Sequence, residues 1–197
     1  MKALFSLLFL ILLSLPGSAQ QASLSDLNQS RLKVQTTGMW VLTGWSVANL
    51  TYGGIAASQT KGSTRYFHQM NMYWNIFNLG ISTPGLISSL RQKNNLPTTL
   101  NESIEDLHGL EKTLIFNTGL DAAYMMGGLY LMERAKTNPD QHDRLKGFGQ
   151  SVLLQGGFLF TFDLINYLAL RNSHKKAAEI LKNVQFTGQS VGVVVEF

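Results

Sequence analysis

The sequence contains no cysteine. This absence excludes disulfide cross-links, thiolate metal sites and thiol nucleophiles, so the fold has to be held together by packing alone. Charged residues make up only 14% of the chain. The basic residues are mixed with acidic ones between apolar stretches and form no stripe with interleaved aromatics, so the sequence predicts no nucleic-acid partner.

Catalytic and cofactor motifs are also missing. The sequence has no HExxH zinc motif, no G-x-S-x-G elbow, no P-loop and no dinucleotide-binding fingerprint. We therefore predict that the protein is not an enzyme of these classes and that it carries no cofactor.

The N-terminus has the three parts of a cleavable secretory signal peptide. Lys2 supplies a positive charge, residues 3–15 are apolar, and residues 16–19 are small, with Gly17 and Ala19 where signal peptidase requires small side chains. The apolar run is too short to cross a bilayer of about 30 Å as a helix. We predict a signal peptide over residues 1–19 and export of the mature chain to the cell envelope.

The mature chain has four stretches that are almost free of charge. They are bracketed by Lys33 and Lys61, by Arg65 and Arg91, by Lys112 and Glu133, and by Lys146 and Arg171. Only Asp121 interrupts the third stretch, and only Asp163 interrupts the fourth. Each has about 20 to 27 residues, enough for a helix to cross a membrane. The pattern predicts an all-α, mainly antiparallel, transmembrane four-helix bundle.

The predicted bundle occupies residues 20–183. Its helices are expected near residues 23–58, 64–90, 101–136 and 143–172, followed by a basic tail helix that ends at 183. Asn101 is expected to cap the third helix, because Asn accepts hydrogen bonds from the first free N–H groups. Residues 184–197 are rich in Val, Gly and Phe and are expected to form an extended, strand-like tail that ends at Phe197.

Two features bear on whether the bundle lies in a membrane or in water. The four stretches are polar for spanning helices, which keeps a soluble periplasmic bundle as the alternative. Gly119, Ala123 and Gly127 recur every four residues, however, and such small-residue faces allow close helix packing in lipid. We predict the membrane form, with this face of the third helix in a helix–helix contact.

Polar residues recur at helical spacing inside the uncharged stretches. His68, Asn71, Asn75 and Asn78 share one face of the second helix; Asn117 and Asp121 share a face of the third, and Asp163 and Asn166 a face of the fourth. A carboxylate inside a membrane is costly unless it is paired, protonated or hydrated, and it marks a candidate functional site. We predict one buried polar seam, in which Asn amides donate to the carboxylates.

The histidines give no sign of a metal site. Glu105 and His108 have the spacing of one half of a di-iron carboxylate site, but the sequence holds no second copy. His142 and His174 are expected on the surface, in a loop and in the tail. We therefore predict no metal ligands.

With the leader, the four bracketed stretches and the row of Asn71, Asn75 and Asn78, the chain resembles an uncharacterised family of small exported bacterial four-helix membrane proteins, a domain of unknown function. The resemblance implies the architecture and no activity.

Three functions remain open on the sequence. The first is a structural or interaction role in the membrane, with lipid, a second copy or another envelope protein as partner. The second is a small transporter or a proton- or ion-coupled carrier that uses Asp121 and Asp163. The third is a soluble periplasmic bundle that binds a lipid or another hydrophobic ligand.

Overall fold

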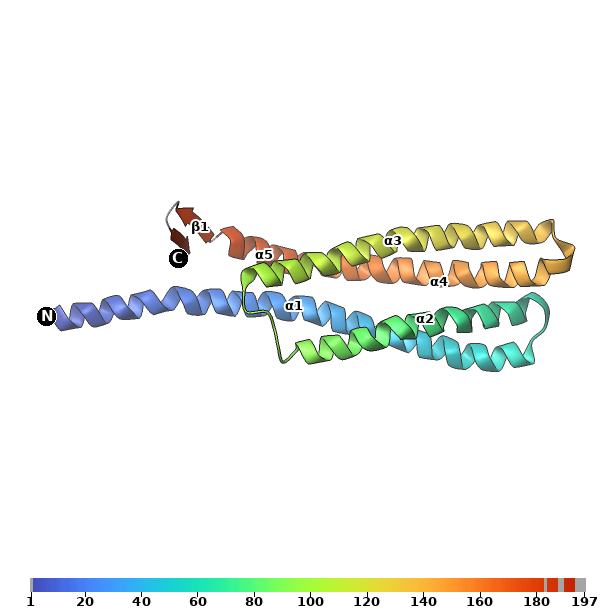
Figure 1. Cartoon of the computed structure of the whole chain (residues 1–197), viewed down its shortest axis with the longest axis horizontal. Helices are drawn as coiled ribbons and strands as arrows, with labels where there is room; N and C mark the ends of the chain where they lie inside the picture. The colour runs from blue at the N-terminus through green and yellow to red at the C-terminus, as the bar shows by residue number, and fades with distance from the viewer. Residues whose placement is uncertain (1, 183, 188–189, 194–197) are drawn as a thin grey trace.

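Four long helices form the body of the protein (Figure 1). The computed structural model describes the backbone of residues 2–182, 184–187 and 190–193 and the side chains of residues 23–182. The long helices are α1 (Lys2–Gln59), α2 (Gly62–Gln92), α3 (Leu100–Lys136) and α4 (His142–Ala169), with a short helix η1 (Pro139–Gln141) before α4 and α5 (Arg171–Lys182) after it. The predicted all-α fold built on four long helices is confirmed.

The predicted signal peptide lies in the first part of α1. The helix is continuous from Lys2 to Gln59, and in Figure 1 its N-terminal part extends beyond the other helices. An apolar leader is helical whether or not it is later removed, so cleavage after Ala19 stays a prediction.

The tail contains two short strands. β1 (Val184–Thr187) pairs with β2 (Ser190–Val193) in antiparallel register, with Val184 opposite Val193 and Thr187 opposite Ser190. The extended tail predicted for residues 184–197 therefore includes a small hairpin, and Phe197 lies outside the described residues.

The long helices form two antiparallel hairpins, α1 with α2 and α3 with α4. Gly62 begins α2 with a φ of 59°, a left-handed conformation that favours glycine. Packing of α2 against α4 joins the two hairpins, and α5 packs against α1. The predicted cap of α3 at Asn101 is wrong: Thr99 is the cap, and its hydroxyl accepts from the Glu102 N–H over 3.3 Å.

The end of the bundle that carries α5 has an ordinary apolar core. Its buried residues are Leu24, Leu27, Leu107, Leu114, Leu170, Ala177 and Ile180. These residues come from α1, α3, α5 and the turn after α4, so the core fastens α5 to the two hairpins. Burial of this apolar surface is the main stabilising contribution at this end.

A buried ion pair lies beside this core. The guanidinium of Arg31, only 3% exposed, is 2.9 Å from the Asp106 carboxylate. Burial lowers the pKa of Arg31, and the charge of Asp106 opposes that shift. Gln92 also donates to Asp106 over 3.0 Å, so the pair connects α1, α2 and α3.

The pattern of burial reverses in the middle of the bundle. There the interior holds polar side chains, including Ser46, Asn71, Asn75, Asn78, Ser82, Asp121, Ser151, Gln155 and Asp163. All the exposed large apolar side chains among the described residues, apart from Leu181, lie inside the four uncharged stretches. The exterior there is therefore largely apolar, and polar side chains outnumber apolar ones among the buried residues of these stretches, the opposite of a water-soluble core.

One helical stretch has the length and the apolar composition of a membrane span. Among the described residues, Pro139–Lys182 alone is long and apolar enough to cross a membrane by length and composition. The other long helices carry polar side chains on their buried faces, as α2 does at His68, Asn71 and Asn75. Such side chains lower the average hydropathy of a helix without changing the face it presents outside.

Glycines allow α3 and α4 to approach closely. A Cβ on Gly128 would lie 2.7 Å from the Gly149 carbonyl oxygen, and one on Gly149 would lie 2.6 Å from the Gly128 carbonyl oxygen. The predicted packing face is wrong within this chain, because Gly119, Ala123 and Gly127 are exposed. The contact is made one residue further along, at Gly128.

Candidate functional site

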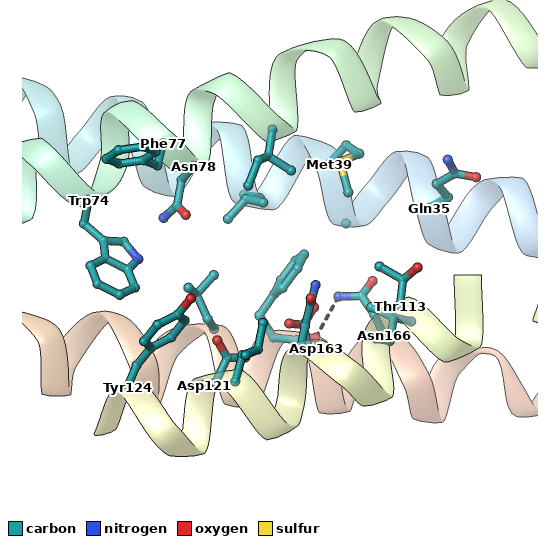
Figure 2. Close-up of a pocket in the computed structure, with 18 of the residues that line it drawn as sticks. Gln35, Met39, Trp74, Phe77, Asn78, Thr113, Asp121, Tyr124, Asp163 and Asn166 are labelled. Atoms are coloured by element: carbon teal, nitrogen blue, oxygen red, sulfur yellow. Dashed lines mark hydrogen bonds between the residues drawn. The ribbon is translucent and has the colours of Figure 1, made fainter. Parts of the chain in front are cut away.

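A cavity of about 560 Å³ lies between the two hairpins, lined by residues from α1, α2, α3 and α4. Figure 2 shows its polar side chains: Asp121 and Asp163 on one side, Asn78 opposite them on α2, and Gln35 toward one end. Most of the remaining lining is apolar or aromatic, including Met39, Leu42, Trp74, Phe77 and Phe162.

The cavity opens sideways between α2 and α3. Of its large apolar lining residues, those that are exposed are Tyr73, Phe77 and Ile81 on α2 and Leu120 and Tyr124 on α3, whereas the lining residues of α1 and α4 are at least partly buried. An edge-to-face contact between Trp74 and Tyr124, with ring centroids 4.8 Å apart, bridges the two helices at one point of this opening. The mouth therefore lies on the apolar exterior.

Two buried carboxyl groups meet in the cavity. Asp121 is 3% exposed and Asp163 is 4% exposed, and both carboxyl groups line this cavity as neighbours. Two neighbouring carboxyl groups can hydrogen-bond to each other only when one of them carries a proton. Oδ2 of Asp121 is buried and has no donor among the described residues. The pair can therefore accept a proton or a cationic group.

The neighbouring amides do not donate hydrogen bonds to this carboxyl pair. Asn166 lines the same cavity, but its amide donates to the Phe162 carbonyl oxygen one turn earlier, over 2.7 Å. Asn117 also lines the cavity. Among the residues whose side chains are described, no Asn amide donates to either carboxylate, in contrast to the predicted seam.

A second polar group lies beyond the cavity, where α1, α2 and α4 meet. Oδ1 of Asn71 accepts from the Ser151 hydroxyl over 2.6 Å and from the Gln155 amide over 2.9 Å. The Trp45 indole donates to Gln155 over 2.9 Å, and Asn78 donates to Asn75 over 3.2 Å. The predicted seam is thus divided into a hydrogen-bonded amide network and a carboxyl site to which no Asn amide donates among the described residues.

His68 belongs to neither group. It is 7% exposed, with its Nδ1 buried and without a hydrogen-bond partner among the described residues. Its ring lies edge-on to Tyr52 and Phe67, with centroids 5.4 and 5.1 Å away. The imidazole therefore acts in this structure as an aromatic packing residue near the start of α2.

The sequence prediction missed Ser151 and Gln155. Their spacing was a usable signal, because Ser151, Gln155 and Asp163 are separated by multiples of four residues and share one face of α4. It also missed that α5 brings His174 beside His108. Their nearly parallel rings have centroids 6.1 Å apart, and His174, which was expected on the surface, is partly buried.

Comparison with known proteins yields a family and no activity. The model of DUF6992, described as a family of unknown function, matches residues 41–164. This range contains the cavity mouth, the amide network and both aspartates. No curated protein matches the chain, and no solved structure matches it.

Proposed function

The chain belongs to DUF6992, a family of unknown function, and we propose that it is an integral membrane protein whose central cavity binds amphipathic cations. The reversed burial in the middle of the bundle is the observation that carries the membrane assignment. Water-soluble monomers rarely expose such extensive apolar surface. In lipid, the same surface is favourable, and polar side chains inside the bundle contact one another instead of hydrocarbon.

The exposed surface of the four uncharged stretches forms an apolar band that we propose lies in the bilayer. Within the four uncharged stretches the exterior carries residues such as Phe77, Ile81, Phe116 and Ile165, each more than half exposed. Charged residues lie beyond both ends of these stretches. The helices also reach the required length, since about 20 residues span a hydrocarbon core of about 30 Å. Export to an envelope membrane after signal-peptide cleavage is part of the proposal.

The cavity favours an amphipathic ligand with a positive head. Asp121 lies nine residues from Lys112, about 13 Å along the helix, so the carboxyl pair is deep inside the proposed band. A charge at that depth requires a partner. The apolar mouth between α2 and α3 would admit a hydrocarbon chain from the lipid, while an ammonium head could contact the unpaired oxygen of Asp121.

The structure does not support the three functions left open by the sequence equally. A soluble bundle would expose the apolar band to water, which disfavours it. A carrier role is compatible with the cavity, because a bound cation and a proton would compete for the same carboxyl pair. A structural or interaction role, through a second copy or another envelope protein, stays a prediction.

Membrane integration is tested by fractionating cells that express the full chain and washing the membranes with alkaline carbonate. We expect the protein to remain in the pellet and to dissolve only with detergent, because the apolar band is buried in lipid. A peripheral membrane protein of the same cells serves as the released control. Recovery of the chain in the carbonate supernatant or the soluble fraction would contradict the membrane assignment.

Ligand binding is tested by tryptophan fluorescence of the purified protein in lipid nanodiscs. A long-chain primary amine should change the emission of Trp74 in a saturable way, whereas the neutral alcohol of equal chain length should not, because only the amine offers a charge to the carboxyl pair. The Trp74→Phe variant separates the emission of Trp74 from that of Trp40 and Trp45. Equal responses to amine and alcohol would refute cation binding while leaving the membrane assignment intact.

A further inference from the structure

We infer that His108, Glu111 and His174 form a binding site for a divalent transition-metal ion that connects α3 to α5. The three residues offer two imidazole nitrogens and a carboxylate oxygen, and all these donor atoms lie within 4.8 Å of one another. This donor set suits Zn²⁺ and other borderline ions better than Ca²⁺ or Mg²⁺, which prefer oxygen ligands. The site lies outside the proposed bilayer band and does not depend on the proposed function.

The contact between His174 and Glu111 is close but is not a well-formed hydrogen bond. Nε2 of His174 lies 3.2 Å from Oε2 of Glu111, yet this nitrogen is buried and has no aligned hydrogen-bond partner among the described residues. The two atoms are therefore close enough to bind a common ion and are not already joined by a hydrogen bond. A hydrogen bond between them would require an N–H of His174 that points at the carboxylate oxygen of Glu111.

The third donor is positioned to complete the site. His108 and Glu111 are three residues apart on α3, so both side chains project from the same face of that helix. The ring of His108 lies nearly parallel to that of His174, at an interplanar angle of 25°. In a tetrahedral zinc site with bonds of about 2.0–2.2 Å, neighbouring ligand atoms are roughly 3.3–3.6 Å apart. His108 is exposed, so its ring is free to make the small inward shift.

The position of α5 explains what the ion would do. Independent contacts already hold α5 on α1: Lys176 donates to the Ser30 hydroxyl over 2.7 Å, and Ala177 and Ile180 are buried in the apolar core. His174 is thereby presented to α3. An ion bound by three side chains would fasten α5 to α3 as well and would leave one coordination position for water or another ligand atom.

The site is tested by calorimetric titration of Zn²⁺ into the purified full chain, prepared in detergent without a histidine tag and stripped with a chelator. We expect one Zn²⁺ per chain and a higher melting temperature in its presence, because binding to the folded state alone stabilises it. His108→Ala and Glu111→Ala should each weaken binding by at least about tenfold. His142→Ala, which removes a histidine outside the cluster, is the matched control and should bind like the unchanged chain.

Two results would overturn the inference. One is the absence of Zn²⁺ binding to a chain whose helical content and melting temperature show that it is folded. The other is binding that His108→Ala and His142→Ala reduce equally, which would indicate adsorption to scattered histidines. Co²⁺ gives a second readout, since its visible absorption reports N/O coordination and should disappear in His108→Ala while the helical content stays unchanged.

Discussion

Replacing Gly149 with alanine is expected to lower the stability of the bundle by about 3 kcal/mol, near the upper end of the usual cost of overpacking. The new Cβ would lie 2.6 Å from the Gly128 carbonyl oxygen and 2.9 Å from the Met132 backbone nitrogen. Neither atom belongs to a side chain that can rotate away, so α3 and α4 would have to separate. Thermal unfolding of the detergent-solubilised protein, followed by circular dichroism, measures the effect.

Gly157→Ala is the matched control in the same helix. A Cβ at Gly157 would meet no atom within 4 Å, and alanine is favoured over glycine inside a helix by about 1 kcal/mol. We therefore expect this variant to melt at the same temperature as the unchanged protein or slightly higher. If both variants lost stability equally, the close approach at Gly128 would not be a determinant of the fold.

The sequence correctly indicated which face of α2 is buried. His68, Asn71, Asn75 and Asn78 were assigned to one face by their spacing, and all four are buried. This was predictable because steps of three and four residues keep side chains on one side of a helix. The polarity of that face in long, uncharged helices also indicated that apolar residues would lie outside.

The same reasoning selected the wrong face of α3. Gly119, Ala123 and Gly127 share a face, but spacing alone does not tell whether that face points to another helix or away. The buried residues of α3 include Leu107, Leu114, Asp121, Gly128 and Ala135, which recur every seven residues. The heptad repeat was visible in the sequence; it mixes apolar, acidic and small residues and therefore lacks the apolar signal by which such repeats are recognised.

The arrangement of the polar site depended on facts that the sequence does not contain. An Asn amide can donate to the carbonyl oxygen four residues earlier in its own helix, as Asn75 does to Asn71 and Asn166 to Phe162. This local contact competes with donation to a carboxylate on another helix. The meeting of His108 with His174 was equally hidden, because it depends on how α5 packs onto α1 after Leu170.

Replacing Asp121 or Asp163 with asparagine is expected to weaken binding of the long-chain amine at least about tenfold, a loss of about 1.4 kcal/mol or more, while the melting temperature stays the same or rises. Asparagine has nearly the same shape as aspartate and brings an amide that can donate to the remaining carboxylate. It also removes one of two neighbouring acidic groups in a buried site, where unpaired charge is costly. Amine titration and thermal unfolding of the same preparations measure the two effects.

Weaker amine binding together with an unchanged or higher melting temperature distinguishes a binding site from a purely structural contact. If the carboxyl pair only fixed the register of α3 and α4, either substitution would lower the melting temperature and leave the amine affinity of the folded protein unchanged. Asp140→Asn removes a carboxylate from the exposed helix η1 and should alter neither quantity. A pair that is retained at a cost in stability and is needed for the ligand is expected of a functional site. A double variant, Asp121→Asn with Asp163→Asn, should abolish the preference for amine over alcohol, because no acidic group would remain in the cavity lining.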